Sequence, residues 1–361
     1  MHSVGITALA VHLPEGLRTN SWWDNKPIPY YGMTPPPTLT NKKHYAYDKA
    51  MEPYITDPFL GSIERRVVYN NETSVSLGVK AAAKALQAAN LSANEIDGLI
   101  AVSMYPDRLG FGDAALIAEK LGIGGGAFNI EASCNGAMSA LLTACGLVKS
   151  GIKSKVLVVT TTLFSRIIDD DKALRFVSDL STAFIIGTVE NGFGLLGSDS
   201  LHLGQTSGNW SIDIIEDQSL PINQRMRLRP SRLYAQVIRT TAEQYLTHTV
   251  KGALCQAKLS IDEIDCVALS TTTAWHAEFS ANVLDIDKTR VINTYPQIAY
   301  AGLSTVPFNL YTAASQQMIK PGEIILLYGY GGQTEASAAI FRWNDISLGP
   351  PPDDATIINQ N

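Results

Sequence analysis

The sequence predicts an α/β protein built from two similar halves. Apolar residues make up 45% of the 361 residues and charged residues only 17%, so the chain can bury a large core. Short apolar runs alternate with segments whose apolar residues recur three and four apart, as strands alternate with helices in α/β proteins. The same order of elements then recurs in the second part of the chain, which indicates a duplicated unit.

The first half is predicted to contain strands and helices in alternation. The expected strands are 4–14, 98–104, 127–132, 155–162 and 181–187, and the expected helices are 74–90, 112–122 and 134–151. The helix at 134–151 is apolar almost all round, which predicts that it is buried.

The second half repeats this order. Its expected helices are 239–257, 276–287 and 307–318, and its expected strands are 266–272, 290–294, 323–330 and 336–343. The link between the halves is expected at 189–194, which gives domains at 1–190 and 191–347. The tail at 348–361 is expected to be frayed. No element is assigned within 198–240 before the helix that contains 239–257.

An aromatic and proline-rich insertion occupies 19–58. Its prolines are too frequent for regular structure, and its tryptophans and tyrosines are too many for a free linker. The segment is therefore expected to pack on the body of the protein. It has two interpretations, a surface wrap or dimer arm, and a wall of a substrate channel.

Charge and composition exclude several functional classes. The net charge of −6 argues against a nucleic-acid-binding surface, which needs clustered Lys and Arg. No apolar run approaches the roughly 20 residues that cross a bilayer, and the N-terminal residues lack the pattern of a signal peptide, so a cytoplasmic protein is expected. The four cysteines are too widely spaced for zinc pairs, and no metal site is expected.

Cys134 is the candidate nucleophile. It stands where a predicted strand ends and a buried helix begins, so its sulfur faces the unpaired N–H groups of the helix start, which favour the thiolate. Its neighbours Ala132, Ser133 and Gly136 are small and leave room for a substrate. The alternative, a small buried core residue, is expected for the other three cysteines, Cys145, Cys255 and Cys266.

Five motifs in order resemble the β-ketoacyl-ACP synthase III family. They are GSIERRVV at 61–68, AAAKALQAANLSANEIDGLIAVS at 81–103, AFNIEASCNGAMSALLTACGLVKSG at 127–151, KVLVVTTTLFSRIIDDD at 155–171 and GEIILLYGYGGQTEASAAIFRW at 322–343. The resemblance covers nearly the whole chain. It implies a thiolase-like five-layered αβαβα fold from two duplicated halves, and a homodimer.

The resemblance also implies how the site works. In the family the cysteine takes an acyl group from a thioester, which assigns this role to Cys134. The N–H groups of Cys134 and Gly332 occupy the positions of the family's oxyanion hole, where a tetrahedral oxyanion needs two preorganised donors. The alternative for Gly331 and Gly332 is a turn between strands, and both interpretations can hold together.

The sequence departs from the family at two catalytic positions. The family's His follows a strand directly, but here residues 270–273 fill that alignment and His276, the best candidate base, comes several residues later. The family's Asn position is occupied by Tyr300. A tyrosine offers one donor and lacks the paired functions of an amide, so decarboxylative condensation by the usual route is not expected.

The expected donor is acyl-CoA or an acyl-carrier-protein thioester, with no permanently bound cofactor. Arg65 and Arg66 are candidate donor-binding residues or structural ion-pair partners, because the family's Trp and Arg before this segment are missing. Gly110 or Phe111 is expected to reach the neighbouring subunit's channel, as the corresponding family loop does.

Three functions remain after these departures. The first choice is an acyltransferase that passes the acyl group from Cys134 to a hydroxyl or amine acceptor, in polyketide or other secondary-metabolite biosynthesis. The second is carbon–carbon condensation with Tyr300 or a threonine among 271–273 replacing the missing groups. The third is an inactive partner subunit of a synthase, against which the retained Cys134 counts.

Overall fold

Two mixed sheets form the framework of the chain. The computed structural model describes residues 2–26, 45–168, 170, 172–218, 224–331 and 334–358. The first sheet has the strand order β14 (Ser347–Leu348), β1 (Ser3–His12), β7 (Asp179–Val189), β6 (Val156–Leu163), β4 (Gly98–Ser103) and β5 (Gly126–Asn129). The second has the order β11 (Cys266–Leu269), β12 (Ile324–Gly331), β13 (Glu335–Arg342) and β8 (Gly194–His202).

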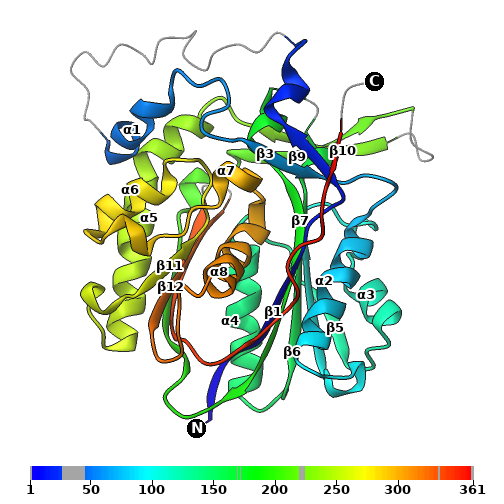
Figure 1. Cartoon of the computed structure of the whole chain (residues 1–361), viewed down its shortest axis with the longest axis vertical. Helices are drawn as coiled ribbons and strands as arrows, with labels where there is room; N and C mark the ends of the chain where they lie inside the picture. Colours follow the sequence, from blue (N-terminus) through cyan, green and yellow to red (C-terminus); the bar gives the residue numbers. More distant parts are fainter. Residues whose placement is uncertain are drawn as a thin grey trace.

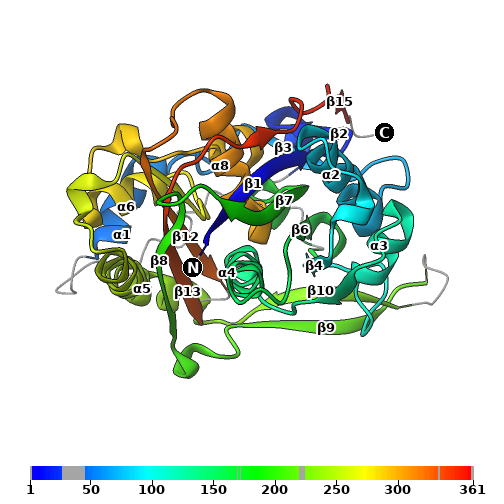
Figure 2. The ribbon, with the colours of Figure 1, turned by 90° about the horizontal axis from the view of Figure 1, so that it is seen from below.

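Helices lie between and outside the two sheets (Figure 1). They are α1 (Ala46–Met51), α2 (Ser74–Ala88), α3 (Ala114–Leu121), α4 (Gly136–Lys149), α5 (Tyr234–Ala257), α6 (His276–Leu284), α7 (Tyr295–Ile298) and α8 (Thr305–Ser315). Helices α2 and α3 cover the outer face of the first sheet, α4 and α8 fill the space between the sheets, and α5 and α6 cover the outer face of the second. Figure 2 shows the same order from below.

Three apolar clusters hold these layers together. The central one joins both sheets through α4 and α8, for example Val158 of β6, Leu141 of α4 and Leu327 of β12. The outer clusters join α2 and α3 to the first sheet and α5 and α6 to the second. The predicted five-layered αβαβα fold is therefore confirmed. The predicted burial of α4 is confirmed as well, because a helix between two sheets contacts apolar residues on both faces.

Local sequence accounts for several helix boundaries. A capping box starts α2, in which the Thr73 side chain accepts from the Ser76 N–H and the Ser76 hydroxyl accepts from the Thr73 N–H. Gly122 ends α3 at a φ of 74°, a left-handed conformation that glycine adopts without strain.

Three regions differ from the prediction. The expected strand at 290–294 does not form, because a 3₁₀ turn at Lys288–Arg290 precedes it and the chain enters α7 soon after, leaving a single bridge between Val291 and Val267. The unassigned stretch 198–240 contains a hairpin of β9 (Trp210–Glu216) and β10 (Gln224–Pro230). In the insertion at 19–58, the described parts contain α1 and two short 3₁₀ helices at Asn20–Trp23 and Glu52–Tyr54.

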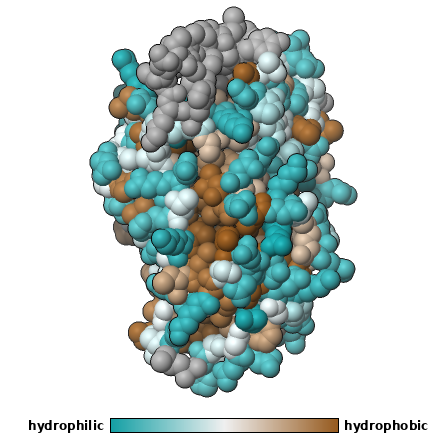
Figure 3. Space-filling view, turned by 90° about the vertical axis from the view of Figure 1, so that its left-hand side faces the viewer, coloured by the Kyte–Doolittle hydropathy of each residue, from teal (hydrophilic) through white to brown (hydrophobic). Residues whose placement is uncertain are grey.

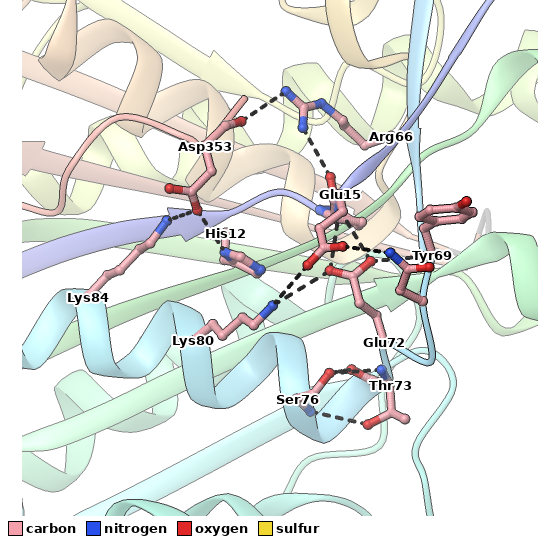
Figure 4. Close-up of polar contacts among 12 residues, drawn as sticks. His12, Glu15, Arg66, Tyr69, Glu72, Thr73, Ser76, Lys80, Lys84 and Asp353 are labelled. Carbon is pink, nitrogen blue, oxygen red and sulfur yellow. Dashed lines mark hydrogen bonds and ion pairs between the residues drawn. The ribbon is translucent and has the colours of Figure 1, made fainter. Parts of the chain in front are cut away.

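The tail is packed rather than frayed as far as residue 358. Its strand β15 (Thr356–Ile357) completes a small sheet with β2 (Gly16–Thr19) and β3 (Glu64–Val67). Asp353 binds Lys84 of α2 at 2.9 Å and lies 3.8 Å from His12 of β1, and its carbonyl accepts from Arg66 (Figure 4). Backbone pairing and ion pairs, neither of which leaves an apolar signal in the sequence, hold the tail in place.

Candidate active site

Cys134 lies in the turn between β5 and α4, two residues before the helix begins. The turn is closed by the Gly136 N–H donating to the Ser133 carbonyl at 2.8 Å, and Asn135 is the N-cap of α4. The Cys134 side chain is half-buried and packs against a cluster of Phe164, Ile167 and Met226. The cysteine therefore stands at the start of a long buried helix, as predicted, but outside its first turn.

Strands β12 and β13 of the second half reach the residues on both sides of Cys134. The Ser133 hydroxyl donates to the Glu335 carboxylate at 2.9 Å, and the Asn135 amide donates to the Ser337 hydroxyl at 2.9 Å. A β-carbon built on Gly331 would lie 2.3 Å from the Asn135 nitrogen, so only glycine fits there. Gly332 lies outside the described residues, and its role in an oxyanion hole remains a prediction.

Tyr300 is brought to the sulfur of Cys134. The two side chains share a hydrogen bond, and burial, followed by the neighbouring Cys134, raises the pKa of the Tyr300 phenol well above its usual value. The phenol is therefore protonated at neutral pH and can donate a hydrogen bond. Its ring packs on Phe164 with centroids 5.8 Å apart.

The backbone around Tyr300 is held by the first half of the chain. The Tyr300 N–H donates to the Phe176 carbonyl at 3.0 Å, and its carbonyl accepts from the Ser178 N–H at 2.9 Å. The preceding Ala299 is fully buried with φ 51° and ψ −154°, a region almost confined to glycine that costs on the order of 1–3 kcal/mol. Strain of this size next to a polar side chain is typical of functional sites.

His276 lies elsewhere, at the start of α6. It is 1% exposed, its Nδ1 is 2.8 Å from the Thr272 hydroxyl, and its ring meets Tyr47 and Phe279 edge-on. Burial lowers the pKa of His276 to about 4, so the imidazole is neutral at pH 7. These contacts bring His276 into the core of the second half, and its hydrogen bond goes to Thr272 rather than to the cysteine.

Thr271, one of the residues 270–273 that fill the alignment of the family's His, also has its side chain in hydrogen bonds. Its hydroxyl accepts from the Asn309 amide at 3.2 Å, and Asn309 in turn accepts from Thr294 at 2.5 Å. All three side chains are buried. This network fixes the loop after β11 and has no signal in the sequence, because its members are far apart along the chain.

The two buried histidines predict a loss of stability in acid. Burial lowers the pKa of His12 and His276 from 6.5 to about 4. Between pH 6.5 and 4 the unfolded chain binds these protons and the folded chain does not, so the free energy of unfolding should fall, by roughly 3 kcal/mol per histidine at the lower end. Buried Asp113 and Asp179, whose pKa values burial raises, act in the opposite direction.

Comparing the pH dependence of stability in the original protein and in a His12 variant isolates the contribution of this histidine. Urea midpoints of the original protein and His12→Gln should diverge as the pH falls from 7 to 4.5, with the smaller pH dependence in the variant. Parallel pH profiles would contradict the assignment of this effect to His12.

The other cysteines divide into two kinds. Cys145 and Cys266 are buried as predicted, and burial raises the pKa of each thiol to about 12. The prediction was wrong for Cys255, which is exposed on α5. All four are free thiols. Within the described ranges, no group of three or more His, Cys, Asp or Glu is placed to hold a metal ion.

Arg65 and Arg66 make contacts that favour a structural role, through hydrogen bonds to carbonyls rather than as the ion-pair partners of the prediction. The Arg65 guanidinium is buried and donates to the carbonyls of Arg175, Ile63 and Ser62 and to the Asn20 side chain. Arg66 donates to the Pro14 carbonyl at 3.0 Å and to the tail (Figure 4). Both guanidinium groups thus tie together segments that are distant in the sequence.

A separate apolar groove lies on the outer side of the second half. Figure 3, which views the face next to α5 and α6, shows an apolar band along its middle. Between the two helices an open groove of about 440 Å³ is lined by residues that include Val250, Leu254, Cys255 and Leu284. These residues belong to the outer layer, on the far side of the second sheet from α4 and Cys134.

Comparison with known proteins tests the resemblance. The family model for 3-oxoacyl-[acyl-carrier-protein] synthase III matches residues 128–201, which include Cys134, and the model for its C-terminal part matches 254–343, which include His276 and Tyr300. Along both matched stretches the chain is similar to ketoacyl synthases III. Such proteins are transferases or condensing enzymes.

Curated relatives and solved structures agree with this family. The β-ketoacyl-ACP synthases III of Microcystis aeruginosa and Desulfitobacterium hafniense are 26% and 27% identical to this ketoacyl synthase III-like chain, over 78% of it and 87% of each relative. The FabH structure from Pseudomonas aeruginosa has a TM-score of 0.76 at 18% identity, covering 95% of this chain and 99% of that one. The priming β-ketosynthase of the R1128 polyketide pathway has a TM-score of 0.76 at 19% identity, covering 95% and 97%.

No helix in the described parts of this ketoacyl synthase III-like chain has the length and apolarity that a membrane span requires.

Proposed function

We propose that this protein is an acyltransferase that accepts an acyl group from a CoA or carrier-protein thioester on Cys134 and passes it to a hydroxyl or amine acceptor. The observation that carries the proposal is the hydrogen bond between Cys134 and the protonated phenol of Tyr300, at the position where the family has an Asn. A phenol beside the sulfur can donate to a thioester or a leaving thiolate.

Decarboxylative condensation would need more hydrogen-bond donors at the site than acyl transfer does. Decarboxylation of a malonyl thioester needs two neutral donors on the developing enolate. Here Tyr300 supplies one, while the hydrogen bond of His276 goes to Thr272 and Thr271 is bound by Asn309. Transfer needs only the acyl-cysteine, an oxyanion hole and removal of one proton from the acceptor.

The second candidate is the condensation reaction itself, favoured by the position of Tyr300. A phenol that reaches Cys134 can also hold the carbonyl of an extender thioester. An inactive partner subunit is disfavoured, because the chain has the nucleophile Cys134, the close approach of Gly331 to its neighbour Asn135 and a strained backbone at Ala299 before Tyr300.

The deciding experiment supplies acylated enzyme separately with malonyl thioester and with a panel of alcohols and amines, and follows CO2 and product mass. Loss of one donor costs about 3–4 kcal/mol, so CO2 release should be slower by a factor of hundreds than in a site with both donors, while acyl transfer should be spared. Ester or amide formation without CO2 would support transfer. Prompt CO2 release with a β-keto product would contradict the transfer proposal and support condensation.

We also propose a homodimer formed at β5. All four residues of β5 are exposed, and among the described residues it is an edge strand paired with β4 alone. Phe128 lies on this strand, and the carbonyl of Phe111, which is 82% exposed, accepts from the Asn129 amide at 2.8 Å. An unpaired apolar edge is a template for a second copy. Light scattering at micromolar concentration should give twice the mass of the chain, and a monomer would refute this assembly.

A further inference from the structure

Glu335 places a carboxylate on the side chain of Ser133, the residue that precedes the nucleophile. It begins β13, and its Oε1 accepts a hydrogen bond from Ser133, the residue before Cys134, at 2.9 Å. Its register partner across the turn is Gly331, whose α-carbon lies against the Asn135 backbone. The carboxylate is thereby fixed beside Ser133, where the ends of β12 and β13 reach the residues on both sides of Cys134.

This charge has no cationic partner in the described part of the chain. Glu335 forms no ion pair there with Lys, Arg or His, although the exposed His202 lies opposite on β8. Its side chain is partly exposed, so a ligand can approach it. Tyr300, whose side chain contacts Cys134, is neutral, and so are the side chains of Ser133 and Asn135 on either side of the cysteine.

We propose that Glu335 selects the second substrate by charge, favouring acceptors that carry an ammonium group and disfavouring those that carry a carboxylate. The proposal rests on the proposed function and names the acceptor class of the same site. A unit charge within several ångströms, partly shielded by solvent, changes the binding of a charged ligand by roughly tenfold or more. Glu335 makes no covalent bond.

The same charge bears on the choice between transfer and condensation. A malonyl extender presents a carboxylate close to the acyl-cysteine, where Glu335 repels it. A neutral or cationic acceptor meets no such penalty. The selection is thus independent of the missing His and Asn donors and adds to their effect.

The first test measures the charge at the sulfur without any substrate. Iodoacetamide and iodoacetate differ in charge but both alkylate Cys134, and the ratio of their rate constants cancels any change in the thiolate fraction. Glu335→Gln keeps the shape and an acceptor for Ser133, and it should raise the iodoacetate-to-iodoacetamide ratio about tenfold. Glu335→Asp should retain the original ratio, as should Glu119→Gln, a matched control on the exposed side of α3. An unchanged ratio in Glu335→Gln overturns the proposal.

The second test addresses the acceptor class. Acylated enzyme is mixed with 3-hydroxypropyl-trimethylammonium, 1-butanol or 4-hydroxybutanoate, three primary alcohols with a single nucleophilic hydroxyl and a cationic, neutral or anionic far end, and discharge of Cys134 is followed by intact mass. The discharge rate should fall in the order ammonium, neutral, carboxylate acceptor. In Glu335→Gln the advantage of the ammonium acceptor and the disadvantage of the carboxylate acceptor, each relative to the neutral one, should shrink about tenfold, through a change in KM. Equal rates for the three alcohols, or no discharge by any, overturn the acceptor assignment. Failure of the original protein to become acylated at all would instead count against the proposed function, while the alkylation ratio would still report on Glu335.

Discussion

Replacing Cys134 with alanine should abolish the covalent acyl-enzyme completely. The original protein, incubated with acyl thioesters, should gain one acyl mass that maps to Cys134, and Cys134→Ala should gain none. The physical reason is that this thiol alone among the four lies both half-exposed and in the turn before a buried helix, where backbone N–H groups stabilise a thiolate.

The exposed Cys255 provides the matched control. It can acquire adducts without any catalytic role, so Cys255→Ser should keep the full rate of specific acylation. Cys145 and Cys266 should stay unlabelled, because burial raises both of their pKa values to about 12. Labelling that survives Cys134→Ala, or that maps to Cys145, would overturn the assignment of the nucleophile.

Tyr300→Phe should slow acyl transfer by a factor of hundreds while leaving the fold intact. The change removes only the hydroxyl that hydrogen-bonds Cys134 and keeps the ring that packs on Phe164. Loss of one preorganised donor typically costs about 3–4 kcal/mol of transition-state stabilisation. Single-turnover acylation and discharge, followed by mass spectrometry, separate the two steps.

Tyr295→Phe is the control for this experiment. Tyr295 is buried in α7, only five positions earlier, and its loss of a hydroxyl should leave the discharge rate within about twofold. If Tyr300→Phe discharges as fast as the original protein, the phenol has no part in transfer and the hydrogen bond to Cys134 is structural only.

Periodic elements of the fold could be predicted from the sequence. Strands such as β6 and helices such as α2 carry a continuous apolar pattern, and each buries a face whose period is visible along the chain. The β9–β10 hairpin was missed although Met226 and Leu228 alternate with arginines on β10, as in an amphipathic strand. Half of its apolar face, Ile212 and Ile214 on β9, is exposed. The tail was missed because ion pairs and two short backbone pairings hold it.

The residues of the candidate site also differ in how far the sequence predicts them. Cys134 has a local signal, a strand followed by small residues and a buried helix. Tyr300 was reached only through the resemblance, and its contact with Cys134 exists because the two halves close on each other. Glu335 had no signal, since its partner Ser133 lies 202 residues away and a lone glutamate at a strand start is usually solvated.

The backbone hydrogen bonds of Tyr300 to Phe176 and Ser178 have a mechanical consequence. The second half contributes this side chain, yet its main chain is fastened to the segment of the first half that leads into β7. Any hinge motion between the halves would therefore carry Tyr300 along with Cys134 and leave their spacing unchanged. Glu335 is joined to Ser133, the residue before Cys134, by a hydrogen bond between side chains. The acceptor side of the site is therefore free to adjust while the sulfur and the phenol move as one body.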